Sequence, residues 1–348
     1  MNSLTHDAPL QPSAAQAVPS PHAPCVFHLG QVIVDLTLHI DHLPERGGDI
    51  FATSNDISVG GGYNVLTAIR RFHAPAVYMG ALGTGPMADK AVEALNKIGV
   101  KTLGPTLPNI DTGYCVAMTE PSGERTFVST RGAETMVPPE TYESINLSEG
   151  DVVYLSGYSF SHKSNREAIE RFARKNKGWA GTTLFDVGPM VADIEDSCIE
   201  TLQNLKFLWS VNEREAAILC KRFSINLSPA EDDNRFYSHQ CLALSRYLNA
   251  PVILRAGAKG AWYCGAAMVS ESSVQFIPTL QVKPIDTNGA GDAHSGALCA
   301  SILLGRPLYE SLVLANCAGA LSTTMNGPAT CPSLEVCQEA AQSLMKTK

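Results

Sequence analysis

The residues best suited to chemistry form the run Asp-Thr-Asn-Gly-Ala-Gly-Asp, from Asp286 to Asp292. Asn288 and Gly289 favour a turn, whereas the residues from Gly291 onward favour a helix, so Asp292 falls in a first helical turn. The N–H groups of a first turn have no partner inside the helix, and the helix dipole makes that end partly positive. Such a small-residue entrance suits an anion, which is either the Asp292 carboxylate acting as a cap or a ligand.

The composition is that of a globular protein with a small-molecule partner. The 348 residues are 45% hydrophobic and 17% charged, which allows a sizeable core in one large domain or two average ones. The net charge of −8 and the lack of a basic run with interleaved aromatic residues argue against nucleic acid as a partner. No apolar run approaches the roughly 20 residues that cross a bilayer, so we expect no membrane partner.

The cysteines and the N-terminus predict a cytoplasmic protein. The 10 cysteines are scattered, without a Cys-x-x-Cys pair or a metal-like Cys/His cluster, which predicts reduced and mostly buried thiols. Residues 1–24 are rich in Pro, Ala, Ser and His, and they lack the basic start and apolar stretch of a secretory signal. We expect them to be a disordered tail and residues 25–348 to be a single domain.

Beyond the tail, short β-rich runs alternate with helical patterns. VVYLSG is followed by SNREAIERFARKN, for example, and AVYMGAL by DKAVEALNKIG. This rhythm predicts an α/β fold with an open, mostly parallel sheet and helices on both faces. The first strand is predicted over CVFHLGQVIVD, which places Asp35 at its end, where ligands bind in open α/β folds.

Two segments interrupt this rhythm, because they are strand-like without an intervening helix. They lie at about residues 36–60 and 111–131, and the second carries a Pro-Ser-Gly hairpin signal. Together they predict a small separate sheet. It is either a lid that excludes water from a reactive site or a surface hairpin without a role. Exposed lid strands would also favour a homodimer.

The chain resembles the ribokinase-like (PfkB) carbohydrate and nucleoside kinases. DTNGAGDAHSGAL and SVGGGYNVLTAIRRF resemble the two signatures of that family. GQVIVDLTLHIDHLPERGGD, the Asn-x-x-Glu pattern that starts at Asn212, and RAGAKGAW also match in the expected order. The resemblance covers about residues 25–345. It implies a ribokinase-like fold with a β lid, and transfer of the ATP γ-phosphate to a hydroxymethyl group of a sugar or nucleoside.

At the anion site, the resemblance makes Asp292 the general base that takes the proton of the attacking hydroxyl. The amides of Gly289, Ala290 and Gly291 would hold the transferring phosphoryl group. Phosphoryl transfer needs positioning, charge neutralisation and a proton acceptor rather than covalent help from the protein. Small residues suit this role because they let the backbone approach the phosphate closely.

The resemblance assigns the acceptor substrate to Asp35, Gly60, Gly61 and Asn64, with Asp49 as a further candidate. The carboxylate would accept hydrogen bonds from sugar hydroxyls, the glycines would let the sugar lie on the backbone, and the amide can both donate and accept. Taken alone, the same residues are equally typical of a turn acid, a flexible loop and a helix cap.

The resemblance assigns Asn212 and Glu215 to the ATP phosphates and to the hydration shell of Mg²⁺, with Glu215 acting through water. Residues three apart at a helix start share a face, although such pairs are also common on exposed turns. Gly257 and Gly260 would belong to the nucleotide loop. Asn316 would line the adenine pocket, unless it is a satisfied core amide.

A monovalent cation such as K⁺ commonly supports the anion site in this family, and Asp286 with nearby carbonyls is its candidate site here. The sequence also departs from the family pattern in the N-terminal signature. Leu66 and His73 stand where a small residue and a glycine are usual. These departures weaken the assignment of the substrate more than that of the reaction.

The predicted activity is phosphorylation of a free sugar or sugar-like alcohol. A nucleoside kinase of the same family is the alternative, because aromatic residues of the lid segments offer stacking surface for a base; they are Phe51, Tyr114 and Phe127. A sugar phosphate is matched less well, because few cations lie near the lid; they are Arg46, Arg125 and Arg131. A sensor without turnover would lack a base or a phosphate site, and a dehydrogenase would need a G-x-G-x-x-G after the first strand.

Overall fold

Alternating apolar side chains along short strands build the main sheet. In β8 (Val152–Ser156), the side chain of Val152 packs in one hydrophobic core and that of Val153 packs in another. Successive side chains of a strand point to opposite faces, so a strand that is apolar at every position is buried on both. The main sheet therefore lies between two cores.

The computed structural model describes all residues except 1–21, 203–204, 206, 228–229, 267–272 and 347–348. Most of the predicted N-terminal tail lies outside the described residues. In the described chain, the main sheet has the strand order β13-β12-β11-β10-β9-β8-β1-β4-β5. Its pairs are parallel except at the edge formed by β12 and β13. The other strands of this sheet are β1 (Val26–His28), β4 (Ala76–Tyr78), β5 (Lys101–Thr102), β9 (Thr182–Asp186), β10 (Phe207–Asn212), β11 (Val252–Arg255), β12 (Ala261–Cys264) and β13 (Gln275–Ile277).

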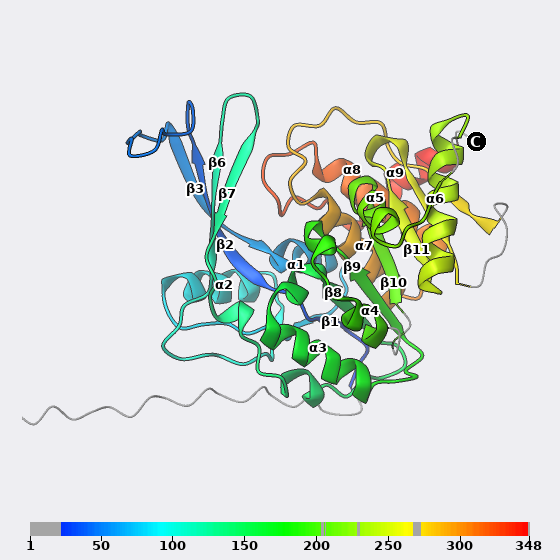
Figure 1. Cartoon of the computed structure of the whole chain (residues 1–348), viewed down its shortest axis with the longest axis horizontal. Helices are drawn as coiled ribbons and strands as arrows, with labels where there is room; N and C mark the ends of the chain where they lie inside the picture. Colours follow the sequence, from blue (N-terminus) through cyan, green and yellow to red (C-terminus); the bar gives the residue numbers. More distant parts are fainter. Residues whose placement is uncertain (1–21, 203–204, 206, 228–229, 267–272, 347–348) are drawn as a thin grey trace, which may run out of the picture.

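Helices cover both faces of the main sheet (Figure 1), which confirms the predicted fold class. One face carries α3 (Lys163–Lys175), α4 (Asp196–Leu202), α5 (Glu213–Arg222) and α6 (Asp233–Leu248). The other face carries α1 (Gly62–Arg71), α2 (Pro86–Lys97), α7 (Ala290–Leu303), α8 (Leu308–Ser322) and α9 (Leu334–Lys346).

Helices α1 and α7 cross in close contact because Gly296 has no side chain. A Cβ atom at Gly296 would lie 2.4 Å from the carbonyl oxygen of Val65 and 2.5 Å from the Cβ of Ala68. This approach brings the first turns of the two helices together, so that Asn64 of α1 reaches Asp292 of α7.

The predicted first strand is in fact two strands of different sheets. β1 ends at His28 in the main sheet, and β2 (Val32–His39) runs in a separate sheet. Between them the chain turns at Gly30, where a Cβ atom would lie 2.7 Å from the His28 ring. The prediction that Asp35 ends a strand of the main sheet is therefore wrong, because Asp35 lies within β2.

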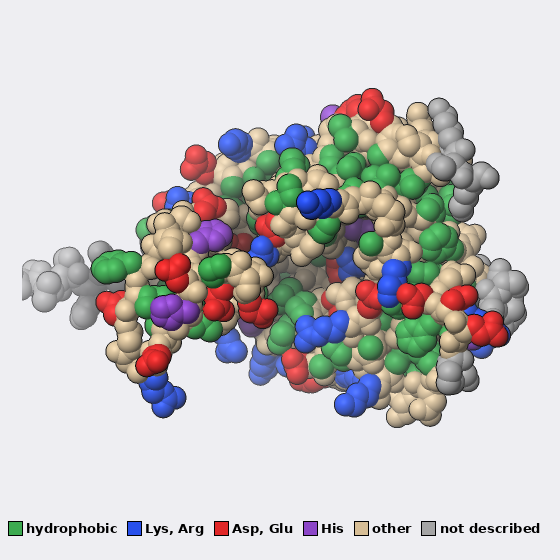
Figure 2. All heavy atoms as spheres, turned by 90° about the horizontal axis from the view of Figure 1, so that it is seen from above, with side chains coloured by type: hydrophobic (Ala, Val, Ile, Leu, Met, Phe, Trp, Pro, Cys, Tyr) green, Lys and Arg blue, Asp and Glu red, His purple; other side chains and the backbone are tan. Residues whose placement is uncertain are grey.

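The separate sheet projects from the body as the predicted lid (Figure 1). Its strand order is β3-β2-β6-β7. The lid starts earlier than predicted, at Val32 rather than near residue 36. Its other strands are β3 (Ser54–Gly61), β6 (Tyr114–Thr119) and β7 (Arg125–Ser129). Seen from above, the surface is hollowed between the lid and the body (Figure 2).

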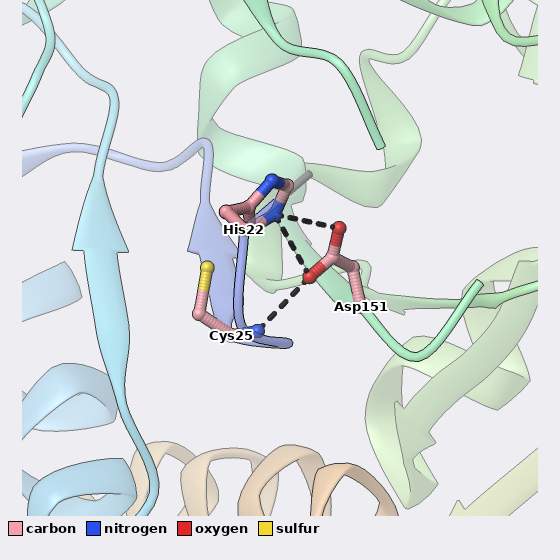
Figure 3. A group of neighbouring side chains, drawn as sticks. All are labelled: His22, Cys25 and Asp151. Atoms are coloured by element: carbon pink, nitrogen blue, oxygen red, sulfur yellow. Dashed lines mark hydrogen bonds and ion pairs between the residues drawn. The ribbon is translucent and has the colours of Figure 1, made fainter. Parts of the chain in front are cut away.

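A three-residue cluster fixes the start of the described chain to the body (Figure 3). His22 Nε2 lies 3.0 Å from Asp151 Oδ2, and the Cys25 N–H donates to Asp151 Oδ1 at 2.9 Å. The Ser148 N–H donates to Oδ2 at 2.6 Å. Burial raises the pKa of the Cys25 thiol to about 12, which keeps the sulfur protonated. The carboxylate is thus satisfied by protein donors, and the cluster acts as a tether.

All ten cysteines are buried and none forms a disulfide, as the scattered spacing predicts. Within the described part of the chain, no helix has the length and apolar character needed to cross a membrane.

His28 links the stability of the core to pH. The imidazole is buried and stacks on Tyr154, with the ring centroids 4.7 Å apart. Burial lowers its pKa from 6.5 to about 3. Between these values the unfolded chain binds a proton that the folded chain does not. The stability that His28 contributes is therefore complete above its unfolded pKa and is lost as the pH falls toward its folded pKa.

We expect acidification from about pH 7 to about pH 5 to lower the free energy of unfolding by about 2 kcal/mol through His28. Denaturant unfolding at both pH values should show that His28→Leu loses about 2 kcal/mol less than the wild type over this interval. The exposed His42→Leu variant should lose as much as the wild type. Equal losses for His28→Leu and the wild type would contradict this interpretation.

Candidate active site

The predicted anion site lies at the N-terminus of α7. Gly289 is the N-cap and has a φ of 75°, and a Cβ atom there would lie 2.0 Å from the carbonyl oxygen of Pro328. Glycine avoids both the left-handed strain and the clash. Ala290 begins the helix, and Gly291 and Asp292 follow in its first turn, as predicted. No side chain caps this end at Gly289, and the Ala290 N–H makes a long hydrogen bond of 3.4 Å to the carbonyl oxygen of Thr287.

The Asp292 carboxylate does not act as the cap of its own helix. Its Oδ2 accepts a hydrogen bond from Asn64 Nδ2 at 2.9 Å. The pKa of Asp292 is raised to about 7, chiefly by burial. The Asn64 hydrogen bond opposes this rise, the Asp186 charge adds to it, and Arg255 opposes it. A carboxyl group that titrates near neutral pH can take up a proton and release it again, as a general base must.

The predicted substrate residues meet at the base of the lid. A Cβ atom at Gly60 would lie 1.9 Å from Asp35 Oδ2, so the carboxylate lies directly over the Gly60 backbone. Burial raises the pKa of Asp35 to about 6, and the Asp35 charge contributes to the raised pKa of Asp292. Gly61 is the N-cap of α1 with a φ of 61°. Among the described residues the buried Asn64 Oδ1 has no hydrogen-bond partner, which leaves an acceptor for a ligand.

Asp49 is not brought into this group. It is exposed in the loop between β2 and β3, at the end of the hairpin opposite Gly61. Its role in substrate binding stays a prediction.

A cavity of about 530 Å³ reaches the N-terminus of α7. It has the size of a small-molecule site. The residues predicted to bind the nucleotide lie around it together with the anion site; they are Asn212, Gly257, Gly260, Asn316, Ala290 and Gly291. The structure therefore places most of the predicted nucleotide residues on one cavity.

The Asn212–Glu215 pair forms a reciprocal cap at the start of α5. Asn212 Oδ1 accepts from the Glu215 N–H at 2.9 Å, while Glu215 Oε2 accepts from the Asn212 N–H at 2.7 Å. Glu215 is only 4% exposed, so the alternative of an exposed helix turn is wrong for this side chain. Burial raises the pKa of Glu215, and the positive charge of Arg255 opposes that rise.

The remaining residues that were predicted to bind the nucleotide also have structural roles. Gly257 and Gly260 have φ values of 51° and 103°, in the left-handed region that favours glycine. Asn316 is buried, and its Nδ2 donates to the carbonyl oxygens of Ile277 and Pro278 at 3.2 and 3.0 Å. Asn316 thus lines the cavity and is also a satisfied core amide. Its place in an adenine pocket stays a prediction.

Sequence reasoning missed two charged residues of the site, Arg255 and Asp186. Arg255 Nη2 donates to Asp186 Oδ1 at 3.1 Å, and the Ser295 hydroxyl donates to Asp186 Oδ2 at 2.7 Å. Each residue ends a strand in the parallel part of the sheet. Ligands bind at the carboxyl ends of such strands, so this position was a signal in the sequence that could have identified both residues. His294, in α7, also lines the cavity. Burial, assisted by Arg255, lowers its pKa to about 3, so the ring is neutral.

The predicted cation residue Asp286 binds a side chain of the lid. Arg125 Nη2 donates to Asp286 Oδ1 at 2.8 Å, and the Asn288 N–H donates to the same oxygen at 2.9 Å. The Gly327 N–H donates to Oδ2 at 3.1 Å. Although burial favours the neutral acid, these donors lower the pKa of Asp286. The first residue of β7 therefore ties the lid to the loop that precedes the anion site.

Breaking this ion pair should loosen the lid. Arg125 is 31% exposed and Asp286 13%, so the pair is worth about 1 kcal/mol or less. We expect Arg125→Ala to speed amide hydrogen exchange in β6 and β7 by up to about fivefold, and raised salt to shrink the difference. The lid variant Arg46→Ala should exchange like the wild type. Unchanged exchange in Arg125→Ala would show that the pair does not hold the lid.

Known proteins resemble this chain over most of its length. A model of the pfkB family of carbohydrate kinases matches residues 26–335. The Escherichia coli protein named uncharacterized sugar kinase YegV is 28% identical over 311 residues, which are 89% of this chain and 92% of that protein. The ribokinase of Arabidopsis thaliana is 26% identical over 314 residues, which are 88% of this chain and 78% of that protein.

The crystal structure of ribokinase from Thermotoga maritima superposes on this chain with a TM-score of 0.73 and 21% sequence identity. The superposition covers 92% of this chain and 99% of that one. It shows that the two chains share their fold.

Proposed function

The chain belongs to the pfkB family of carbohydrate kinases, and from that premise we propose that its acceptor is the hydroxymethyl group of a free sugar or sugar-like alcohol. The observation that carries this proposal is the position of the Asp292 carboxylate, which accepts a hydrogen bond from Asn64 beside the first turn of α7, where no side chain caps the helix. Burial raises its pKa to about 7, which supports a role as proton acceptor. Asp35 and Asn64 offer acceptors for hydroxyl groups on one side of it, and the cavity lies on the same helix end.

In the proposed reaction, Asp292 accepts the proton of the substrate hydroxyl while the hydroxyl oxygen bonds to the γ-phosphorus of ATP. The bond from that phosphorus to the bridging oxygen breaks, and ADP leaves with the electron pair. The amides of Gly289, Ala290 and Gly291 hold the phosphoryl group during transfer. Closure of the lid keeps water, the competing acceptor, out of the site.

We assign the nucleoside of ATP to the cavity beside Gly257, Gly260 and Asn316. Mg²⁺, when bound, would neutralise charge on the phosphates. Both carboxylate oxygens of Glu215 already accept hydrogen bonds from Asn212, which fits a role through the water shell of the ion better than direct ligation. Asp286 is the proposed site of a monovalent cation such as K⁺, which would compete there with Arg125.

A nucleoside is the second candidate acceptor. Tyr158 is half exposed, and burial together with the charges of Asp292 and Glu215 raises its pKa to about 12. The Tyr158 ring therefore lies near Asp292, the proposed general base. There it offers a surface on which the nucleobase of a nucleoside could stack. A sensor that binds without turnover fits less well, because the chain keeps both Asp292 and the Gly-Ala-Gly turn that we propose as base and phosphate site.

We also propose a cytoplasmic homodimer that pairs through the lid. Phe127 and Val128 are 58% and 57% exposed on β7, the edge strand of the lid sheet. An edge strand with exposed apolar side chains is a template for pairing with a second copy.

ADP release with Mg·ATP should identify the acceptor when it is measured over free pentoses, hexoses, sugar acids, nucleosides and sugar phosphates. We expect substrate-dependent ADP from the wild type and turnover lowered by roughly 10²-fold or more in Asp292→Asn, which removes the proton acceptor. Near-normal turnover in that variant would exclude Asp292 as the base. If the protein bound ATP but released no ADP with any acceptor, the result would favour the hypothesis of a sensor without turnover.

The pH dependence gives an independent test of the base. Asp292 must be ionised to accept a proton, so kcat/KM should rise with pH through about 7. The Asn64 amide favours the ionised form, and Asn64→Ala should therefore move this rise to higher pH. The exposed Asn96→Ala variant on α2 is the control and should keep the wild-type profile. A profile that Asn64→Ala leaves in place would argue against this hydrogen bond as a determinant of the pKa.

A further inference from the structure

Arg255 places a guanidinium group inside the active site. It is the last residue of β11, its side chain is 13% exposed, and it lines the cavity. Its Nη2 lies 3.1 Å from Asp186 Oδ1 and 3.8 Å from Glu215 Oε2. Its Nη1 donates to the carbonyl oxygen of Gly291 at 3.4 Å. The guanidinium thus reaches from the acid at the start of α5 to the first turn of α7.

The position of Arg255 against Gly291 is the observation that points to function. A Cβ atom at Gly291 would lie 2.9 Å from Arg255 Nη1, so the guanidinium lies against the turn that is proposed to hold the phosphoryl group. A guanidinium has five N–H donors and no acceptor. Among the described residues the buried Nε of Arg255 has no hydrogen-bond partner. Donor capacity therefore remains for the oxygens of a ligand.

A purely structural role accounts for only part of this arrangement. Arg255 and Ser295 both bind Asp186, and together they clamp α7 to the ends of the strands. That clamp uses one terminal nitrogen of the guanidinium. The hydrogen bond from Nη1 to the Gly291 carbonyl oxygen adds a second structural contact. Neither contact explains why, among the described residues, Nε is left without a partner.

The negative charges around Arg255 are a second reason to expect a cation at this position. Asp186, Glu215 and Asp292 are all near enough to Arg255 to favour its charged form. Three acids around one space would repel the phosphates of a nucleotide unless positive charge lay among them. Arginine suits this role because its planar fork can donate two hydrogen bonds to one phosphate while it also holds a carboxylate.

We propose that Arg255 is a catalytic residue that donates hydrogen bonds to the γ-phosphoryl group during its transfer. This inference rests on the proposed function. As the acceptor oxygen bonds to phosphorus and the bond to the bridging oxygen of ADP breaks, negative charge develops on the oxygens around phosphorus. The acceptor proton goes to Asp292, and Arg255 keeps its own protons and stabilises this charge from the side of Gly291.

Binding measurements test the contact without any acceptor substrate. ATP and ADP differ by the γ-phosphate alone, so we expect Arg255→Ala to weaken ATP binding about tenfold or more in calorimetry and ADP binding far less. Arg255→Lys, which keeps a point charge but loses the fork, should retain part of the preference for ATP. Equal losses for ATP and ADP in both variants would overturn the inference and leave Arg255 as a clamp.

Turnover measurements test the catalytic step. With an acceptor that the wild type uses, we expect kcat to fall about 10²- to 10³-fold in Arg255→Ala. Guanidinium chloride, well below unfolding concentrations, should restore part of that kcat, whereas sodium chloride at equal ionic strength should not. A structural role would not respond in this way. A kcat of Arg255→Ala close to that of the wild type would exclude Arg255 from the reaction. A lowered kcat that guanidinium does not restore would assign Arg255 a structural role.

Ser295→Ala is the matched control, because it weakens the clamp on Asp186 without touching Arg255. It should lower the melting temperature and leave the ratio of ATP to ADP affinity unchanged. A loss of that ratio in Ser295→Ala would assign the effect to the position of α7 rather than to the guanidinium. If the wild type turned over no acceptor, the proposed function would fail, while the comparison of ATP with ADP would still decide the inference on Arg255.

Discussion

The close crossing of α1 and α7 is the constraint on which the active site depends. Gly296 lets α7 approach α1 until the two backbones are nearly in contact, and this distance sets how far apart Asn64 and Asp292 lie. A larger residue at Gly296 would separate the helices and break the hydrogen bond that helps to keep Asp292 ionised. The proposed base and the proposed anion site belong to the same first helical turn, so both would move with this contact.

The lid contributes Asp35 to the proposed substrate site and is tied to the body by an ion pair. The Asp35 carboxylate lies over the Gly60 backbone of the neighbouring lid strand, so both residues belong to the same small sheet. Arg125 of the lid pairs with Asp286, in the loop that precedes the proposed anion site. A movement of the lid would therefore shift Asp35 and the Arg125 charge together.

The electrostatics of the site come from burying several acids together. Burial raises the pKa of both Asp35 and Asp292, and mutual repulsion contributes to the value for Asp292. Arg255 pairs with Asp186 and lies near Glu215, and its charge opposes the rise at Asp292. Without a buried cation, protonation would relieve the repulsion and remove the proton acceptor. A single arginine can therefore serve the base, the nucleotide phosphates and the attachment of α7 to the sheet.

Local patterns were enough to predict the α/β class, the separate small sheet and the first turn of α7, because hydrophobic period, turn residues and helix signals depend on neighbouring residues. The motifs also indicated Asp292, Asn64 and the cavity glycines. The division of the first strand at Gly30 and the pairing of Arg255 with Asp186 became evident in the folded chain alone. These contacts join residues far apart in the chain, and no local pattern specifies which strand ends become neighbours or which polar side chain turns inward.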